Sequence, residues 1–98
     1  MSRVVFFPAA RDDLEAIAFY IAEDNPRRAL QFKNQLEEKA LSLAHYALRA
    51  PLAPEAGPDI RRLIHGNYII YYRAMNKDDT VFILRILHAG RDISILEI

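Results

Sequence analysis

Residues 61–92, RRLIHGNYIIYYRAMNKDDTVFILRILHAGRD, constrain the fold most, because they predict two consecutive β-hairpins. Gly66 and Asn67 separate two runs rich in β-branched and aromatic residues, and a two-residue loop of this composition favours a tight primed turn. Residues 76–79 are polar and stand between two further apolar runs, which predicts a second turn. The sequence therefore predicts a three-stranded antiparallel meander.

The first turn also fixes the register of its hairpin, pairing His65 with Tyr68. If the second turn closes without a bulge, Arg85 lies on one face of the sheet and His88 on the other. A single bulge in the last strand would move both residues across the sheet. Both faces contain mostly apolar residues, so we expect the sheet to be covered on both sides.

The N-terminal third predicts a strand followed by a helix. Residues 3–7, RVVFF, are β-branched and aromatic, and Pro8 stops the strand and can open the helix. Apolar residues then recur at the spacing of one helical stripe. They are Leu14, Ile17, Ala18 and Ile21. The residue before Pro26 is disfavoured in the α conformation, so the helix should end near Asp24.

Asn25 and Pro26 predict a second helix, with an N-cap side chain followed by proline at the first helical position. Its apolar residues continue to Ala47 and span about half of the helical circumference, wider than the ~100° stripe of a helix that rests on one surface. Leu30, Leu41 and Leu48 lie beside the main stripe. We therefore expect this helix to contact the first helix, the sheet and a subunit or protein partner.

Residues 49–60 contain three of the five prolines, which predicts a stiff loop between the helices and the meander. The fold class is therefore α+β, with two layers: an N-terminal strand and a two-helix hairpin packed on a mainly antiparallel sheet of three to five strands. Residues 93–98 could add an edge strand. A length of 98 residues suits one domain. The two helices cover one face, so we expect a second polypeptide on the other.

Composition excludes several classes of function. Thirteen basic and thirteen acidic residues cancel, so the chain has no global attraction to nucleic acid. Cysteine is absent, which excludes disulfides and thiolate metal sites, and no run approaches the ~20 apolar residues of a membrane helix. We expect a cytoplasmic protein. We find no glycine-rich phosphate loop or hydrolase motif, and His65 and His88 fall on opposite faces in the register without a bulge. We therefore expect no catalytic residue, no metal and no cofactor.

The remaining chemical signal is a concentration of basic residues among aromatic ones. Guanidinium groups bind phosphate or carboxylate in pairs of hydrogen bonds, and tyrosine is enriched in protein interfaces. The set that we predict as a contact surface for a target or partner is Arg61, Arg62, Arg73, Arg85, His88, Arg91 and Asp92. The alternative is structural: the tyrosines pack in the core, while the arginines pair with carboxylates of the chain.

Three segments, DDLEAIAFYIAEDNP, RRLIHGNYIIYYR and ILRILHAGRD, resemble those of the RelE/ParE superfamily of toxin-antitoxin toxins. The resemblance is closer to the ParE branch, also known as plasmid stabilisation proteins, and extends over nearly the whole chain in the same order. It implies one ParE-like toxin domain over residues 1–98. It also implies an antitoxin of the ParD type, for which our candidate contacts are Leu30, Leu41, Leu48, Tyr71 and Tyr72.

Within this superfamily, RelE-like members cleave messenger RNA in the ribosome, whereas ParE-like members are regarded as poisons of DNA gyrase. The mRNA-cleaving relatives place an arginine directly after the tyrosine that opens the middle strand, and that position here is Ile69. Arg91 is similar to their arginine near the end of the last strand, but no tyrosine follows Tyr72 to match their C-terminal one. The resemblance thus implies a non-enzymatic gyrase inhibitor. The alternatives are a ribosome-dependent ribonuclease and a non-toxic remnant that only binds antitoxin.

Overall fold

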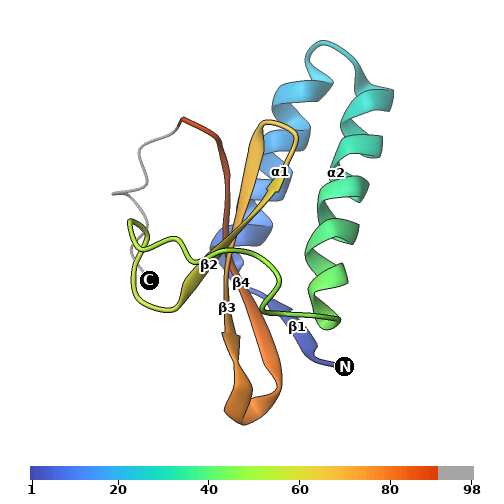
Figure 1. Cartoon of the computed structure of the whole chain (residues 1–98). Coiled ribbons are helices and arrows are strands. Elements are labelled where there is room, and N and C mark those ends of the chain that lie inside the picture. The colour runs from blue at the N-terminus through green and yellow to red at the C-terminus, as the bar shows by residue number, and fades with distance from the viewer. Residues whose placement is uncertain (91–98) are drawn as a thin grey trace.

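The computed structural model describes residues 1–90, which form a four-stranded sheet with a two-helix hairpin on one face (Figure 1). The chain order is β1 (Arg3–Phe6), α1 (Pro8–Ala22), α2 (Pro26–Leu41), β2 (Ile60–His65), β3 (Tyr68–Met75) and β4 (Thr80–His88). Short 3-10 turns occupy Ser42–Ala44 and Asn76–Asp78. The sheet order is β1-β4-β3-β2, with β1 parallel to β4 and the other pairs antiparallel. The predicted α+β fold is confirmed.

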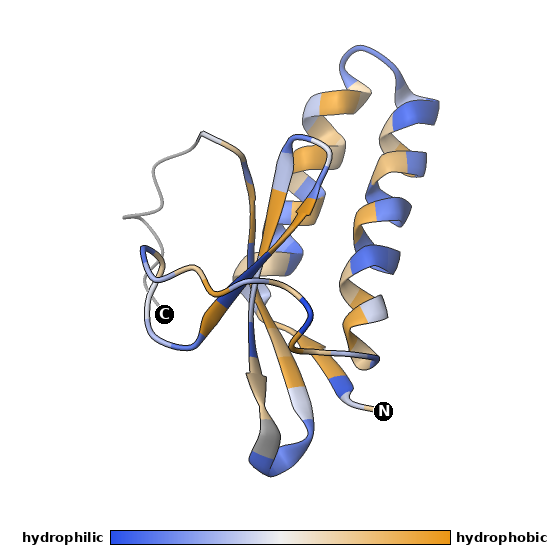
Figure 2. Cartoon of the chain, viewed as in Figure 1, coloured by the Kyte–Doolittle hydropathy of each residue, from blue (hydrophilic) through white to orange (hydrophobic). Residues whose placement is uncertain are grey.

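Both helices begin where their prolines predict. Phe7 is extended and Pro8 opens α1, while the side chain of Asn25 caps α2 by accepting a hydrogen bond from the backbone N–H of Arg28 at 3.1 Å. Figure 2 shows hydrophobic and hydrophilic residues alternating along both helices, as amphipathic helices require. None of the described helices has the length and apolar character needed to cross a bilayer.

The prediction that the second helix runs to Ala47 is wrong, because α2 ends at Leu41. The Ser42 hydroxyl donates to the carbonyl oxygen of Lys39, and the chain tightens into the 3-10 turn that follows. Leu43 is nevertheless fully buried, so the apolar stripe reaches the core beyond the end of the α-helix.

The meander forms as predicted at both turns. His65 pairs with Tyr68 across the Gly66-Asn67 turn, where Gly66 has a φ of 60°, and Met75 pairs with Thr80 across the second. The register without a bulge is correct up to Ile83, which pairs with Tyr72, and wrong beyond it, because Tyr71 pairs with Arg85. Leu84 is therefore the extra residue of a β-bulge.

The bulge reverses the alternation of side chains in the second half of β4. Ile86 pairs with Ile70, and His88 pairs with Tyr68, so all four lie on the face that carries the helices. Leu87 moves to the other face with Leu84. The sequence analysis left this alternative open, and the structure adopts it.

The sheet is covered on both faces by the chain itself. On the helix side, the core contains buried residues of both helices and of β3 and β4, including Leu14, Leu36, Ile70, Tyr72 and Ile86. A second cluster on the other face contains Ala53, Ile60, Tyr71, Leu84 and Leu87. Ala53 belongs to the loop between the helices and the meander. The expectation that a second polypeptide must cover this face is therefore wrong, since its central residues are already buried.

Candidate functional site

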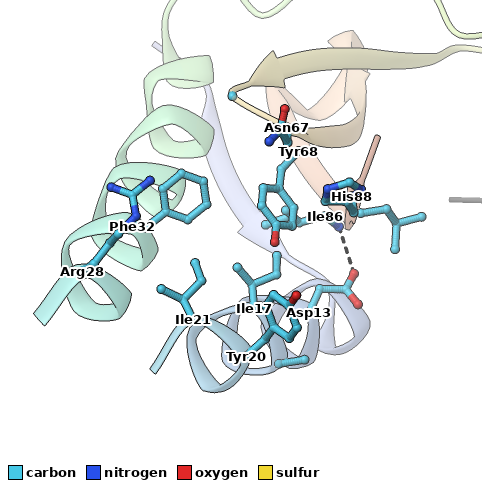
Figure 3. A pocket seen from close by; sticks show the side chains of 13 residues that line it. Asp13, Ile17, Tyr20, Ile21, Arg28, Phe32, Asn67, Tyr68, Ile86 and His88 are labelled. Carbon is cyan, nitrogen blue, oxygen red and sulfur yellow. Dashed lines mark hydrogen bonds between the residues drawn. The ribbon is translucent and has the colours of Figure 1, made fainter. Parts of the chain in front are cut away.

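A cleft of about 720 Å³ opens between the tip of the helical hairpin and the β2–β3 turn (Figure 3). Its floor is apolar and consists of Ala16, Ile17, Ile21, Phe32 and Ile86. Its rim is polar and consists of Tyr20, Arg28, Asn67, Tyr68 and His88. An apolar floor with a few polar groups above it is typical of a binding site, so this tip cleft is the candidate site.

A row of aromatic rings joins the two sides of the tip cleft. The ring of Phe32 on α2 lies 5.7 Å from that of His65 and 5.4 Å from that of Tyr68. Tyr68 in turn meets His88 edge-on at 5.3 Å. Contacts of this geometry are favourable beyond the area they bury, so they fix the β2–β3 turn against α2.

His65 and His88 thus lie on the same face, on either side of Tyr68, and the prediction of opposite faces is wrong. The strand that carries Tyr68 runs between them. Within residues 1–90, no three histidine or carboxylate side chains are close enough to hold a metal ion. The edges of the tip cleft carry aromatic and basic side chains.

Asp13 closes one wall of the tip cleft by bonding to β4. Its carboxylate accepts from Nε and Nη2 of Arg85, at 2.8 and 3.0 Å, and from the backbone N–H of Ile86 at 2.9 Å. β1 pairs with β4 only as far as Phe6, so Asp13 takes the place that a neighbouring strand would otherwise occupy beside Ile86. The hydrogen bonds that Arg85 donates to Asp13 raise the pKa of its guanidinium above the ordinary value.

The four predicted arginines within the described residues do not form one surface. Arg61 donates to the carbonyl oxygen of Ala50, Arg62 pairs with Glu55, Arg73 donates to the carbonyl oxygen of Pro58, and Arg85 binds Asp13. These contacts measure 2.7, 2.6, 3.3 and 2.8 Å. Arg61, Arg62 and Arg73 fasten the loop between the helices and the meander, and Arg85 fastens α1. Of the four, Arg62 and Arg85 pair with carboxylates, as in the structural alternative that the sequence left open.

His88 is different, because it is exposed on the rim of the tip cleft. Arg91 and Asp92 lie outside the described residues. The function of the predicted contact set therefore stays a prediction.

Two of the five apolar candidates for antitoxin contact are wrong for this conformation. Tyr71 and Tyr72 are 2% and 0% exposed, because each packs into one of the two core clusters. The hydroxyl of Tyr72 donates to the carbonyl oxygen of Ala47 at 2.7 Å, and burial raises its pKa above the ordinary value. Leu30, Leu41 and Leu48 are 62%, 46% and 53% exposed, so they are available to a partner.

Arg28, Phe32 and the hydrogen bonds of Asp13 were not predicted from the sequence as parts of the site. The hydrogen-bond partners of Asp13 lie 72 and 73 residues away in the sequence. Only the packing of α1 on β4 brings them together. Phe32 belongs to the apolar stripe of α2, and nothing in that pattern distinguishes a residue at the edge of a cleft from one in the core.

Comparison with known proteins places the chain in a family. Residues 4–93 match the model of the ParE toxin of type II toxin-antitoxin systems, parDE. Among curated protein sequences, none matches significantly. Several solved structures are similar, and all three described next cover about nine-tenths of this chain.

A chromosomal ParDE system from P. aeruginosa aligns with a TM-score of 0.75 at 24% identity, over 92% of this chain and 98% of that one. The RelBE2 toxin-antitoxin complex from Mycobacterium tuberculosis aligns with a TM-score of 0.65 at 29% identity, over 89% of this chain and 96% of that one. The intact E. coli RelBE complex aligns with a TM-score of 0.66 at 15% identity, over 93% of this chain and 100% of that one. This similarity shows a shared fold. Because the family model extends over almost the whole chain, this protein belongs to the ParE toxin family of type II toxin-antitoxin systems.

Proposed function

We propose that this toxin acts by binding DNA gyrase and trapping it on cleaved DNA, without covalent chemistry of its own. The match to the ParE model over residues 4–93 is the observation that carries the proposal. Ile69 supports it, because the position at which mRNA-cleaving relatives have an arginine holds an apolar side chain. That side chain packs with Tyr71 and Leu87 on the face away from the helices.

We further propose that a ParD-type antitoxin neutralises the toxin. Two of the similar structures are toxin-antitoxin complexes by their descriptions, and a third is a ParDE system. The exposed leucines Leu30, Leu41 and Leu48 provide apolar contacts for such a partner. The exposed imidazole of His88, at the rim of the tip cleft, is our candidate for contact with gyrase.

Expression without the antitoxin tests toxicity first. We expect growth arrest, and purified toxin should make gyrase accumulate cleaved DNA in a supercoiling reaction. Toeprinting of a translating extract examines the rival activity, because a ribonuclease would cut messages within the ribosomal A site. Ribosome-dependent cleavage with no effect on gyrase would overturn the proposal. Normal growth on expression would instead favour a non-toxic remnant.

A pair of histidine variants tests the contact residue. His88→Ala removes an imidazole from the tip cleft, whereas His45→Ala removes an exposed imidazole that lies beyond the end of α2. We expect His88→Ala to weaken gyrase poisoning and His45→Ala to leave it unchanged. Equal activity of the two variants would exclude His88 from the contact with gyrase.

A further inference from the structure

The turn that follows α2 presents Tyr46 to solvent in a conformation that tyrosine rarely adopts. Its φ is 55°, in the left-handed region, and its side chain is 85% exposed. A bulky residue in this region is strained, and such strain persists only where the surrounding contacts impose it. An apolar ring held in this way in water contributes nothing to the core, so its location calls for a role outside the fold.

Three groups of hydrogen bonds hold this turn in place. The hydroxyl of Tyr72 donates to the carbonyl of Ala47 at 2.7 Å, and Arg61 donates to that of Ala50 at 2.7 Å. Arg49 donates to the Ser42 hydroxyl at 2.6 Å, and its backbone N–H donates to the carbonyl of Tyr46 at 3.0 Å. The ring of Tyr46 is therefore presented by a preorganised backbone, which reduces the entropy lost on binding.

The chemistry around Tyr46 indicates what would bind there. Leu41 and Leu48 are about half exposed in the same segment of chain. The hydrogen bonds of Arg49 and Arg61 to described residues all go to hydroxyl or carbonyl oxygens, and neither guanidinium forms an ion pair with a described carboxylate. The surface thus combines exposed apolar side chains with two positive charges that no described carboxylate neutralises.

The position of Leu30 links this surface to the rest of α2. Leu30 and Leu41 are eleven residues apart, which is close to three helical turns, so they lie on the same side of the helix. A partner segment that runs along this side from Leu30 reaches the end of α2 at Leu41 and then the turn that carries Tyr46.

We infer that Tyr46, with Leu41 and Leu48, is an anchor for the antitoxin, and that it receives a segment in which an apolar side chain stands beside a carboxylate. The apolar side chain packs on the ring of Tyr46, and the carboxylate faces Arg49 and Arg61. This inference rests on the proposed neutralisation by an antitoxin and adds where the antitoxin binds and by which chemistry.

Two glycine substitutions separate binding from folding. Tyr46→Gly removes the ring and relieves the strained φ, so its melting temperature should equal or exceed that of the wild type. Asp59→Gly is the matched control, because Asp59 also has a positive φ, of 62°, and is exposed elsewhere on the chain. The probe is the purified product of the reading frame next to the toxin gene, with affinity measured by titration calorimetry.

We expect Tyr46→Gly to weaken binding of this probe by about thirty-fold or more, as for an interface hot spot, while Asp59→Gly stays within about two-fold. Raising the salt concentration should weaken wild-type binding, because the contact pairs opposite charges. If Tyr46→Gly binds as tightly as the wild type, or if salt has no effect, the inference is overturned while the antitoxin proposal stands. If the wild type does not bind the probe, the antitoxin proposal itself fails. If Tyr46→Gly binds normally but no longer arrests growth, the turn contacts the target and the inference is likewise overturned.

Discussion

The carboxylate of Asp13 offers the sharpest test of how this fold is held together. Replacing Asp13 with alanine removes the two hydrogen bonds from Arg85 and the one from the backbone of Ile86. The side chains of Arg85 and Asp13 are only 20% and 14% exposed, so water replaces these contacts poorly. An uncompensated charge and an unpaired N–H would remain near the sheet.

The expected loss follows from these contacts. Hydrogen bonds to charged groups contribute about 1.5–3 kcal/mol, and breaking a buried pair costs about 3–5 kcal/mol. Since this pair is only partly buried, we expect Asp13→Ala to lower the free energy of unfolding by about 3 kcal/mol. For a domain of this size each kcal/mol shifts the melting temperature by about 4–8 °C, so the loss corresponds to roughly 12–24 °C.

The neighbouring residue supplies the control. Asp12→Ala makes the same substitution one position earlier in α1, where the side chain is exposed, and gains the same helix propensity. We expect its free energy of unfolding, from urea denaturation, to stay within about 0.5 kcal/mol of the wild type. The Ile86 amide should also exchange hydrogen faster in Asp13→Ala. If Asp13→Ala matches Asp12→Ala in both measurements, the carboxylate does not complete the edge of β4.

Three further predictions concern the core and the turns. Tyr72→Phe should cost about 1 kcal/mol near neutral pH in urea denaturation, because the hydrogen bond to Ala47 is lost. Burial raises the pKa of Tyr72 above 10.0, so the stability from its neutral phenol is present below about pH 10 and is lost as the pH rises further. Over that pH range, Tyr72→Phe should lose less stability than the wild type. Gly66→Ala should lower stability by about 1 kcal/mol at its φ of 60° and Gly66→Asn by less, which thermal melts can compare. Asn25→Ala should lower the free energy of unfolding by about 1 kcal/mol through loss of the cap on α2, whereas Asn25→Asp should retain most of the wild-type stability. Equal stability of these two variants would contradict the capping role.

The helices, strands and turns could be predicted from the sequence because the residues that start or stop them act locally. Three such signals affect only the few residues next to them: the Gly66-Asn67 turn, the proline at the start of each helix and the capping side chain of Asn25. Each was visible in the sequence at its own position. The end of α2 was harder to predict, because the apolar stripe continues to Leu43 although the helical hydrogen bonds do not.

The candidate site was predictable only in part, because its geometry depends on distant contacts. The bulge at Leu84 arises from how β4 meets β3, and it decides that His88 faces the helices. The partner of Asp13 lies 72 residues away and that of Arg61 lies 11 residues away in an irregular loop, so neither bond could be inferred from neighbouring residues. The family resemblance identified the class of protein without indicating which side chains line the tip cleft.

The central place of β4 in the sheet has a consequence for incomplete chains. Both β1 and β3 flank this strand, and Arg3 pairs with Thr80, so the first strand has no partner until the last one is present. A fragment that ends before Thr80 loses both ladders at once, together with the main contact between α1 and the sheet. We therefore expect stop codons that precede the codon for Thr80 to yield unfolded fragments that proteases remove, so that such alleles have no toxicity.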